Sequence, residues 1–354
     1  MAVSIDEAYI IILRRVVEDA ETFAFNRVTK RLARGIDGDP NWADRRLAEV
    51  RAMNKEIGDG LKDLRAETGT VEERIIAASK NGAAQAIEEL QSANLLHPSL
   101  EGAEMARGRT LRLLVSKAVN VLEASHFQIL RTANDVYRST IAEAVSQSAT
   151  GVMTRKQAAQ TALNRFADKG IRGFVDKAGR QWDIASYTEM ATRTSLAQAS
   201  VEGHLASLEA HGHDLVIVSS STEACESCYR WEGKVLSIGG MTEGYPTLEQ
   251  AKSGSHLFGP NCTHSTGIYI KGMTRKPEIV PAKDRRRDYN QRQQQRYNER
   301  GIRHWKKREA VALDENERAS ARAQVQAWQA KQRAFIEETD RRRDYGRESI
   351  VAAR

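Results

Sequence analysis

The stretch that decides the fold of the central region is residues 214–238, DLVIVSSSTEACESCYRWEGKVLSI. Its apolar run Leu215–Val218 is too short for a helix, is rich in β-branched residues and ends in three serines, which predicts a buried strand. The spacing Cys225-x-x-Cys228 is typical of a turn in which two thiolates reach one ion. The segment that follows, WEGKVLSI, predicts a second strand.

All three cysteines of the chain lie in this region, because Cys262-x-His264 follows the CxxC pair. Two such pairs on neighbouring hairpins predict a closed tetrahedral site, the arrangement of structural zinc, with Cys225, Cys228, Cys262 and His264 as ligands. His264 is favoured because it shares a short turn with Cys262; His256 is the alternative ligand, or would support one by hydrogen bonding. A redox CxxC fits less well, since no βαβ pattern surrounds it, and reduced thiols without metal remain a third interpretation.

The flanking sequence predicts the rest of a compact α+β domain over residues 151–273. Thr154-x-x-Gln157 is a capping box that opens a helix. Helical periodicity resumes after a hairpin pattern that turns at Gly179, and a last strand follows the third cysteine. The expected elements are helices at 154–168 and 185–210, a hairpin at 173–184 and a strand at 265–272.

Residues 1–150 are expected to form a helical region that contacts a partner protein. Apolar residues from Leu111 onward recur in steps of three, four and seven, which indicates one face of a long helix. Such a helix either packs in a bundle or lies against another protein. Earlier helices are expected at 6–32, 42–64 and 71–90, separated by turn signals that include a break at Gly69.

The positive charge of the chain belongs to its C-terminal segment, residues 274–354, with 22 basic and 13 acidic residues against 32 and 34 elsewhere. Two charged helices joined near Leu313 and Asp314 are expected here, as a basic helical tail. The densest part, 283–308, holds 11 basic and three acidic residues. This block is an electrostatic footprint for a polyanion such as DNA, or a solvated helix face with internal ion pairs.

Composition excludes several other classes of protein. Hydrophobic residues are 40% and charged residues 29%, too apolar a mixture for wholesale disorder. The longest apolar stretch, residues 8–13, is far below the roughly 20 residues of a membrane helix, and acidic residues precede it, so neither a membrane contact nor a signal peptide is expected. Phosphate-loop, dinucleotide, nucleophile-elbow and HExxH motifs do not occur, and no catalytic residue is assigned. The predicted fold class is therefore α+β, predominantly α-helical.

The combined pattern resembles the tailed-phage minor capsid proteins, the portal-associated head-morphogenesis family. The resemblance rests on SYTEMATRTSLAQASVEGHL, on the CxxC-x-x-W-x-G-x-V segment, on TLEQAKSGSHLFGPNCTHSTGIYIKGMTR and on the basic helical tail, and it covers about residues 150–354. The four ligand positions match the family pattern residue by residue. One departure is Gly259-Pro260-Asn261-Cys262, where the family commonly has His-Pro-Asn-Cys.

The resemblance implies a non-enzymatic virion protein near the portal vertex that supports head assembly and DNA packaging or delivery. Expected partners are the portal protein, the major capsid protein, or both, and packaged DNA through the basic tail. Expected locations are the capsid, and the host cytoplasm during assembly. Alternatives from other classes are a zinc-dependent, non-specific nucleic-acid-binding protein and a metal-dependent nuclease or toxin-like transferase.

Overall fold

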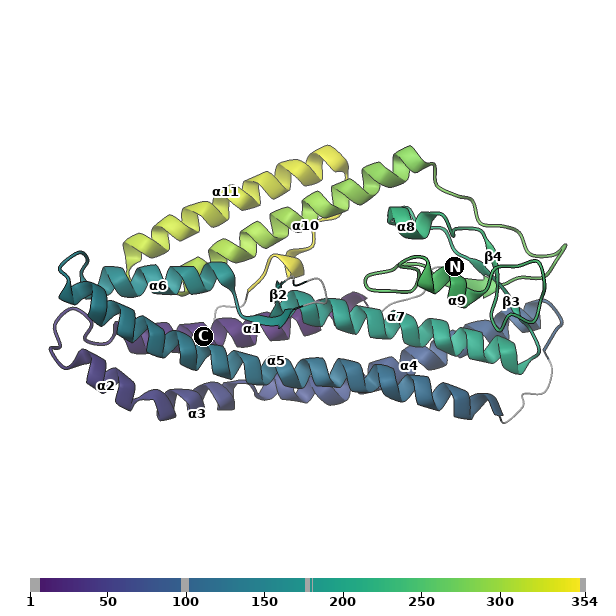
Figure 1. The fold of residues 1–354 in the computed structure, drawn as a ribbon. Helices are drawn as coiled ribbons and strands as arrows, with labels where there is room; N and C mark the ends of the chain where they lie inside the picture. The colour runs from purple at the N-terminus through teal and green to yellow at the C-terminus, as the bar shows by residue number, and fades with distance from the viewer. Residues whose placement is uncertain (1–6, 97–101, 176–178, 180, 351–354) are drawn as a thin grey trace. The chain divides into compact units, whose positions relative to one another are not determined.

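The computed structural model describes residues 7–96, 102–175, 179 and 181–350, and it confirms a predominantly helical α+β chain (Figure 1). Most of the predicted hairpin turn and both chain ends lie outside these residues. The helices are α1 Glu7–Ala33, α2 Trp42–Ala48, α3 Val50–Gly60, α4 Lys62–Ser92, α5 Gly102–Ala149, α6 Arg155–Lys169, α7 Ile184–Ala210, α8 Glu226–Tyr229, α9 Leu248–Ser253, α10 Ala282–Ala310, α11 Glu315–Thr339 and the 3-10 helix η1 Tyr345–Arg347. The strands are β1 Arg172–Val175, β2 Gln181–Asp183, β3 Leu215–Val218, β4 Val235–Ser237 and β5 Thr266–Ile268.

Residue contacts divide the chain into two compact units, each built from three separate stretches. Helices α1, α4, α5, α7 and α10 contribute residues to both units. The segments 1–150, 151–273 and 274–354 describe how composition changes along the chain, and each of them supplies both units. Unit 1 consists of Met1–Ile10, Thr68–Val121 and Met190–Gln293, and unit 2 of Ile11–Glu67, Leu122–Glu189 and Gln294–Arg354.

Unit 1 contains a three-stranded antiparallel sheet in the order β4-β3-β5. The predicted strand β3 is central, and Val216 and Val218 on it are fully buried. Helices α4 and α7 approach closely where both have glycine. A Cβ added to Gly82 would lie 1.9 Å from the carbonyl oxygen of Ser200, and one added to Gly203 would lie 2.0 Å from that of Ser79. Only glycine permits this crossing.

Unit 2 confirms two local predictions. Helix α6 begins with the reciprocal capping box, in which the Thr154 side chain accepts from the Gln157 backbone and the Gln157 side chain accepts from the Thr154 backbone. Strands β1 and β2 pair antiparallel as the predicted hairpin. The fully buried Trp42 donates its indole N–H to the carbonyl of Leu32 at 3.0 Å, which ties the start of α2 to the end of α1.

The predicted helix break at Gly69 is wrong, because α4 runs through it without interruption. A glycine in a helix interior costs about 1 kcal/mol relative to alanine, and the sequence argument gave this cost too much weight. The apolar face on both sides of the glycine is fully buried at Leu64, Val71 and Ile75. Burial of that face outweighs the local propensity.

A buried charge network holds the elements of unit 2 together. Arg14 lies 3.1 Å from Glu18 and 2.6 Å from Glu189, and its side chain is 5% exposed. Lys307 of α10 lies 2.6 Å from Glu21, whose side chain is fully buried. The network joins α1, the β2–α7 junction, α10 and η1, and its members are Arg14, Glu18, Glu21, Asp183, Glu189, Arg303, Lys307 and Arg347.

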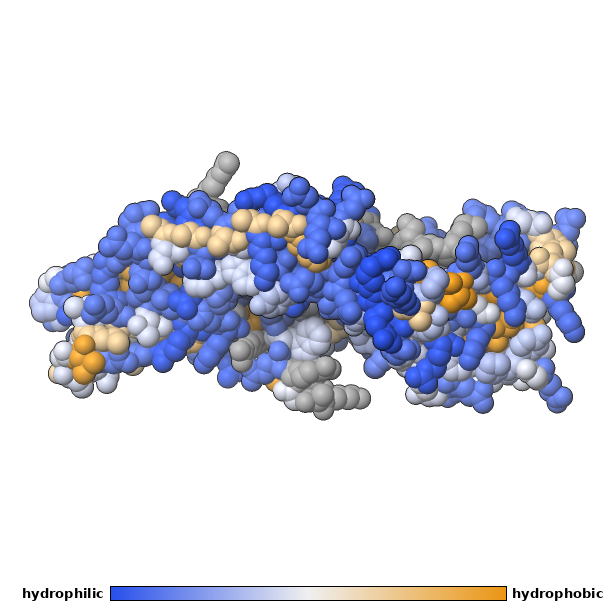
Figure 2. Space-filling view, turned by 90° about the horizontal axis from the view of Figure 1, so that it is seen from above, coloured by the Kyte–Doolittle hydropathy of each residue, from blue (hydrophilic) through white to orange (hydrophobic). Residues whose placement is uncertain are grey.

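The two C-terminal helices form as predicted and pack on each other within unit 2. The indole of Trp328 occupies the space over Gly301, and Val325 is buried. Figure 2 shows hydrophilic residues over most of the face seen from above, crossed by a row of weakly hydrophobic residues. Exposed alanines recur along α11, at positions 319, 323, 327, 330 and 334.

Candidate metal centre

The first arm of the site is the short helix α8, which follows β3. Cys225 precedes this helix with an extended backbone, and its carbonyl accepts hydrogen bonds from the amides of Cys228 at 3.1 Å and Tyr229 at 3.0 Å. This tight turn is the one that the CxxC spacing predicts, and it carries the Cys228 thiol to the site.

The second arm is the loop that leads into β5. The Gly259 amide donates to the carbonyl of His256 at 2.8 Å, and the Cys262 amide donates to the carbonyl of Gly259 at 3.1 Å. Asn261 takes a left-handed conformation with φ 59°, which asparagine tolerates better than most residues. Because β5 pairs with β3, this turn lies beside α8.

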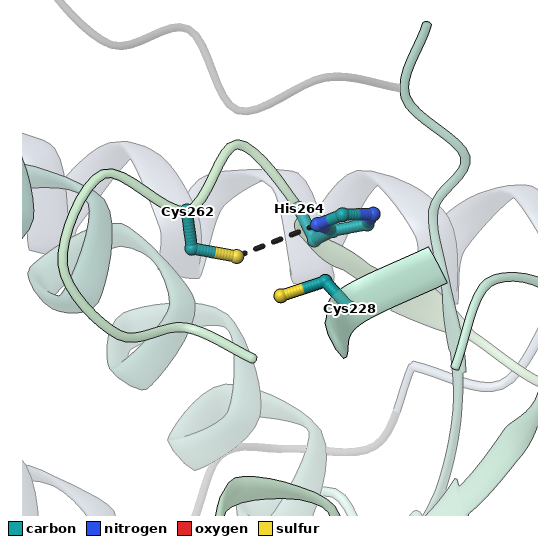
Figure 3. Close-up of side chains that lie close together, drawn as sticks. All are labelled: Cys228, Cys262 and His264. Atoms are coloured by element: carbon teal, nitrogen blue, oxygen red, sulfur yellow. Dashed lines mark hydrogen bonds between the residues drawn. The ribbon is translucent and has the colours of Figure 1, made fainter. Parts of the chain in front are cut away.

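The two arms bring three ligand atoms together (Figure 3). The Sγ atoms of Cys228 and Cys262 and one imidazole nitrogen of His264 all lie within 4.8 Å of one another. Cys262 Sγ lies 3.4 Å from His264 Nδ1. All three cysteines are free thiols, and the predicted ligand Cys225, which precedes α8, is not a member of this group of three. We call these three residues together with Cys225 the thiol–imidazole cluster.

The candidate ligand His256 lies elsewhere. Its side chain is exposed, and its backbone amide donates to Ser227 Oγ at 2.9 Å. In the described part of the chain, the group of possible metal ligands around Cys228 therefore includes His264 and does not include His256.

The electrostatics of the cluster favour ionised sulfur at Cys225 and Cys262, whereas interactions with these two thiols and burial raise the pKa of Cys228. The interaction with Cys228 lowers the pKa of Cys225 to about 5 and that of Cys262 to about 4, against the opposing effect of burial. Burial disfavours the charged form of His264, but Cys262 and a neighbouring carboxylate raise its pKa nonetheless. Thiolate is the form of cysteine that binds metal, so a metal ion bound through Cys228 would displace the proton of that thiol.

The donor set fits a tetrahedral zinc ion. Bonds of about 2.3 Å to sulfur and about 2.0–2.1 Å to nitrogen place neighbouring ligand atoms roughly 3.5 Å apart. The separation of 3.4 Å between Cys262 Sγ and His264 Nδ1 agrees with this spacing. When bound, zinc would supply a structural crosslink between α8 and the loop before β5.

The sequence analysis missed a carboxylate behind the cluster. Glu232 Oε1 lies 2.8 Å from His264 Nε2, and both side chains are at most 1% exposed. The same carboxylate accepts hydrogen bonds from the Ser221 amide at 2.9 Å and from Ser220 Oγ at 3.3 Å. Glu232 directly follows Trp231, but no local pattern in the sequence distinguishes it from the chain's 46 other carboxylates.

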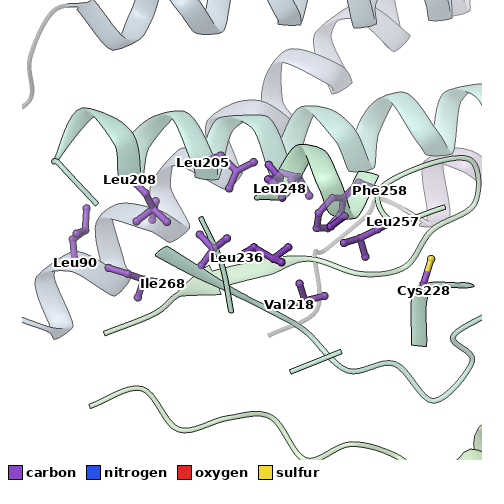
Figure 4. Close-up of a cluster of buried hydrophobic side chains, with 14 residues drawn as sticks. Leu90, Leu205, Leu208, Val218, Cys228, Leu236, Leu248, Leu257, Phe258 and Ile268 are labelled. Carbon is purple, nitrogen blue, oxygen red and sulfur yellow. The ribbon is translucent and has the colours of Figure 1, made fainter. Parts of the chain in front are cut away.

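The cluster borders the hydrophobic core of unit 1 (Figure 4). Cys228 is a member of that core, and Cys225, Cys262 and Trp231 pack against it. The ammonium of Lys234 lies 4.9 Å from the centre of the Trp231 ring. A core on one side and a buried imidazole on the other limit access of water to the sulfur atoms.

A second buried polar group in unit 1 joins a hydroxyl, an imidazole and a carboxylate. His204 Nε2 lies 2.9 Å from Glu89, and His204 Nδ1 lies 3.0 Å from Thr266 Oγ1. Glu89 also accepts from the Ile268 amide at 2.8 Å. His204 and Thr266 are each 3% exposed, so this group connects β5 to α4 and α7 and is closed to a substrate.

The basic residues of α10 are largely engaged with carboxylates of their own unit. In unit 1, Arg285 pairs with Glu226 at 2.7 Å, and Arg292 pairs with Glu223 at 2.9 Å. In unit 2, several cations of α10 belong to the buried charge network. At the start of α10, five exposed residues line a hollow of about 420 Å³: Ala282, Lys283, Arg286, Arg287 and Asn290. Arg287 there pairs with Asp284 at 3.0 Å and with Asp288 at 2.9 Å.

Among the described residues, no helix combines the length and hydropathy that a membrane span requires.

The architecture is predominantly helical with a small cysteine-rich sheet region, and comparison with known proteins defines the class of protein. The family model of phage minor capsid protein 2 matches residues 13–337. The chain belongs to this phage minor capsid family, as the sequence resemblance predicted.

A curated relative is named "Structural protein" in Lactococcus phage LL-H, and it is 26% identical over 234 residues. The alignment covers 62% of this chain and 62% of the relative. No solved structure matches the chain.

Proposed function

We propose that this phage structural protein is a non-enzymatic component of the portal vertex that supports head assembly and DNA packaging or delivery. The observation that carries the proposal is the match to the minor capsid family over residues 13–337. The protein assembles in the host cytoplasm and remains in the virion, where its partners are the portal protein, the major capsid protein, or both.

The long helix α5 supplies a surface suited to such a partner. Phe127 on it is 67% exposed and Val145 is 43% exposed, and both belong to unit 2. The two residues are 18 positions apart, which is five helical turns, so they share one side of the helix. Exposed apolar side chains along one side of a helix offer apolar area for a partner protein to bury.

Infection with a phage that lacks this gene, complemented by the plasmid-borne gene, tests the assembly role. We expect wild-type particles to contain the chain, and particles made without it to be misassembled, empty or non-infectious. A photo-reactive residue at position 127 should crosslink to portal or capsid protein, whereas one at the exposed Gln324 of α11 is the control. Infectious particles that never contain the chain would contradict the proposal.

We further propose that Cys225, Cys228, Cys262 and His264 hold one structural zinc ion. Four protein ligands leave no open coordination position, so this site would staple the sheet region and would not hydrolyse a substrate. Metal analysis of protein purified without chelator should give about one zinc per chain. Less than about 0.2 zinc per chain, with titratable free thiols, would contradict it.

A contact with packaged DNA is a second candidate role. The ion pairs of α10 limit the number of its basic residues that can bind phosphate. The hollow lined by Lys283, Arg286 and Arg287 offers exposed cations for phosphate, whereas the buried Arg303 and Lys307 do not. Such binding should weaken steeply with salt and should not depend on base sequence. A chain with Lys283, Arg286 and Arg287 replaced by glutamine should lose duplex binding at about 50 mM salt, and unchanged binding would exclude this surface.

A further inference from the structure

The imidazole of His264 is held from the side opposite the sulfur atoms. Its Nδ1 faces Cys262 Sγ at 3.4 Å, and its Nε2 faces Glu232 Oε1 at 2.8 Å. An ionised carboxylate has no proton to donate, so the contact requires that Nε2 carries the proton and donates it. In the neutral ring, Nδ1 then has its lone pair directed at the cluster.

The carboxylate of Glu232 is itself fixed. The Ser221 amide donates to Oε1, and Ser220 Oγ donates to Oε2, so both oxygens have partners. Ser219 continues this arrangement, because its amide donates to the Ser265 carbonyl at 3.0 Å and its Oγ accepts from the Ser265 amide at 2.9 Å. The three serines after β3 therefore fix the carboxylate and the loop that carries the imidazole.

We propose that Glu232 is a positioning residue for the metal site, which makes His264 bind the ion through Nδ1 and strengthens the bond. This inference rests on the proposed zinc site. A histidine ligand that donates its other N–H to a carboxylate is fixed in one tautomer and ring orientation. The carboxylate also makes the metal-binding nitrogen more basic. Loss of such a partner commonly lowers metal affinity about 10–100-fold.

Competition with a chromophoric chelator measures the effect on the full chain. Glu232→Gln keeps an oxygen acceptor of the same shape but removes the charge, and we expect it to weaken zinc binding about 10–100-fold. The matched control is Glu243→Gln, which makes the same change at an exposed residue of the same unit and should leave the affinity unchanged.

Nuclear magnetic resonance of ¹⁵N-labelled histidine separates positioning from a general loss of structure. In the zinc-loaded native chain, His264 should show metal on Nδ1 and a proton on Nε2. In Glu232→Ala the preference for that tautomer should weaken, which a change in overall stability alone would not produce.

The outcomes separate the two proposals. A native chain that binds no zinc overturns both. A native chain that binds one zinc, with metal on Nε2 of His264 or with the affinity of Glu232→Gln within twofold of native, overturns the role of Glu232 and leaves the zinc site standing.

Discussion

The sheet region of unit 1 and the helices of unit 2 connect distant segments by different means. In unit 1, two short turns meet at the thiol–imidazole cluster, where cysteine thiols and one imidazole lie beside a small hydrophobic core. In unit 2, the connection is distributed over many buried carboxylates, guanidiniums and one ammonium. The comparison teaches that short turns can gather polar side chains at one point, whereas long helices share charges along their length.

The largest expected effect is at the cluster. Cys228→Ser removes a buried sulfur that lies within 4.8 Å of the ligand atoms of Cys262 and His264. We expect loss of zinc together with several kcal/mol of stability in unit 1, because metal affinity is folding free energy in so small a site. Zinc content and chemical denaturation measure both effects. Retention of one zinc per chain at native affinity would show that Cys228 is not a ligand.

The next effect tests the buried charge network. Lys307→Met leaves the fully buried carboxylate of Glu21 without its ammonium partner, and we expect a loss of about 3–5 kcal/mol in unfolding free energy. The matched control is Lys156→Met, which breaks the more exposed pair with Asp314 and should cost less than about 1 kcal/mol. Equal costs for the two variants would contradict a stabilising role that depends on burial.

The two regions differ in how many of their structural features the sequence predicts. The β-branched run of β3, the capping box of α6 and the CxxC turn are local patterns, and the structure confirms these elements. Glu232 lies 32 positions from His264 along the chain, and only strand pairing brings the two together. The sequence therefore left His264 and His256 open as ligands and could not find the supporting carboxylate.

The charge of the tail shows the same limit. Counting residues located the basic excess in 274–354 correctly, but it could not show that Arg303 and Lys307 face Glu18 and Glu21, almost 300 positions earlier. The two compact units also interleave three stretches each, so no composition shift along the chain marks their limits.

The buried carboxyl group of Glu299 should make the stability of unit 2 depend on pH. Burial raises the pKa of Glu299 to about 8, even though Arg303 and Arg14 favour its ionised form. Since the unfolded value is near 4.5, the folded state binds the proton more tightly, and stability should fall as the pH rises from about 4.5 to about 8.

Glu299→Gln removes the pH-dependent contribution of this carboxyl group to the unfolding free energy. Its unfolding free energy relative to native should increase across that pH range, whereas the exposed Glu315→Gln should follow the native curve. Denaturant titrations at several pH values measure the difference. Parallel curves for Glu299→Gln and native protein would show that the carboxylate is already ionised at low pH.

The smallest expected effect compares two glycines of α4 in unit 1. Gly82→Ala places a methyl group against the Ser200 carbonyl of α7, and we expect a loss of roughly 1–3 kcal/mol. Gly69→Ala meets nothing within 4 Å and should stabilise the helix by about 0.5–1 kcal/mol. Thermal unfolding of both variants checks the signs, and a neutral Gly82→Ala would mean that the α4–α7 crossing is looser than described.

Hydrogen exchange of the full chain, before and after removal of zinc by a chelator, tests most directly the claim that a local metal crosslink holds one unit and distributed charges hold the other. The account predicts that amides of β3, β4 and β5 lose protection when zinc is removed, while α1, α6 and the Gln294–Ala310 part of α10 keep theirs. Equal loss of protection in both units, or no loss in the three strands after zinc has left, would contradict it.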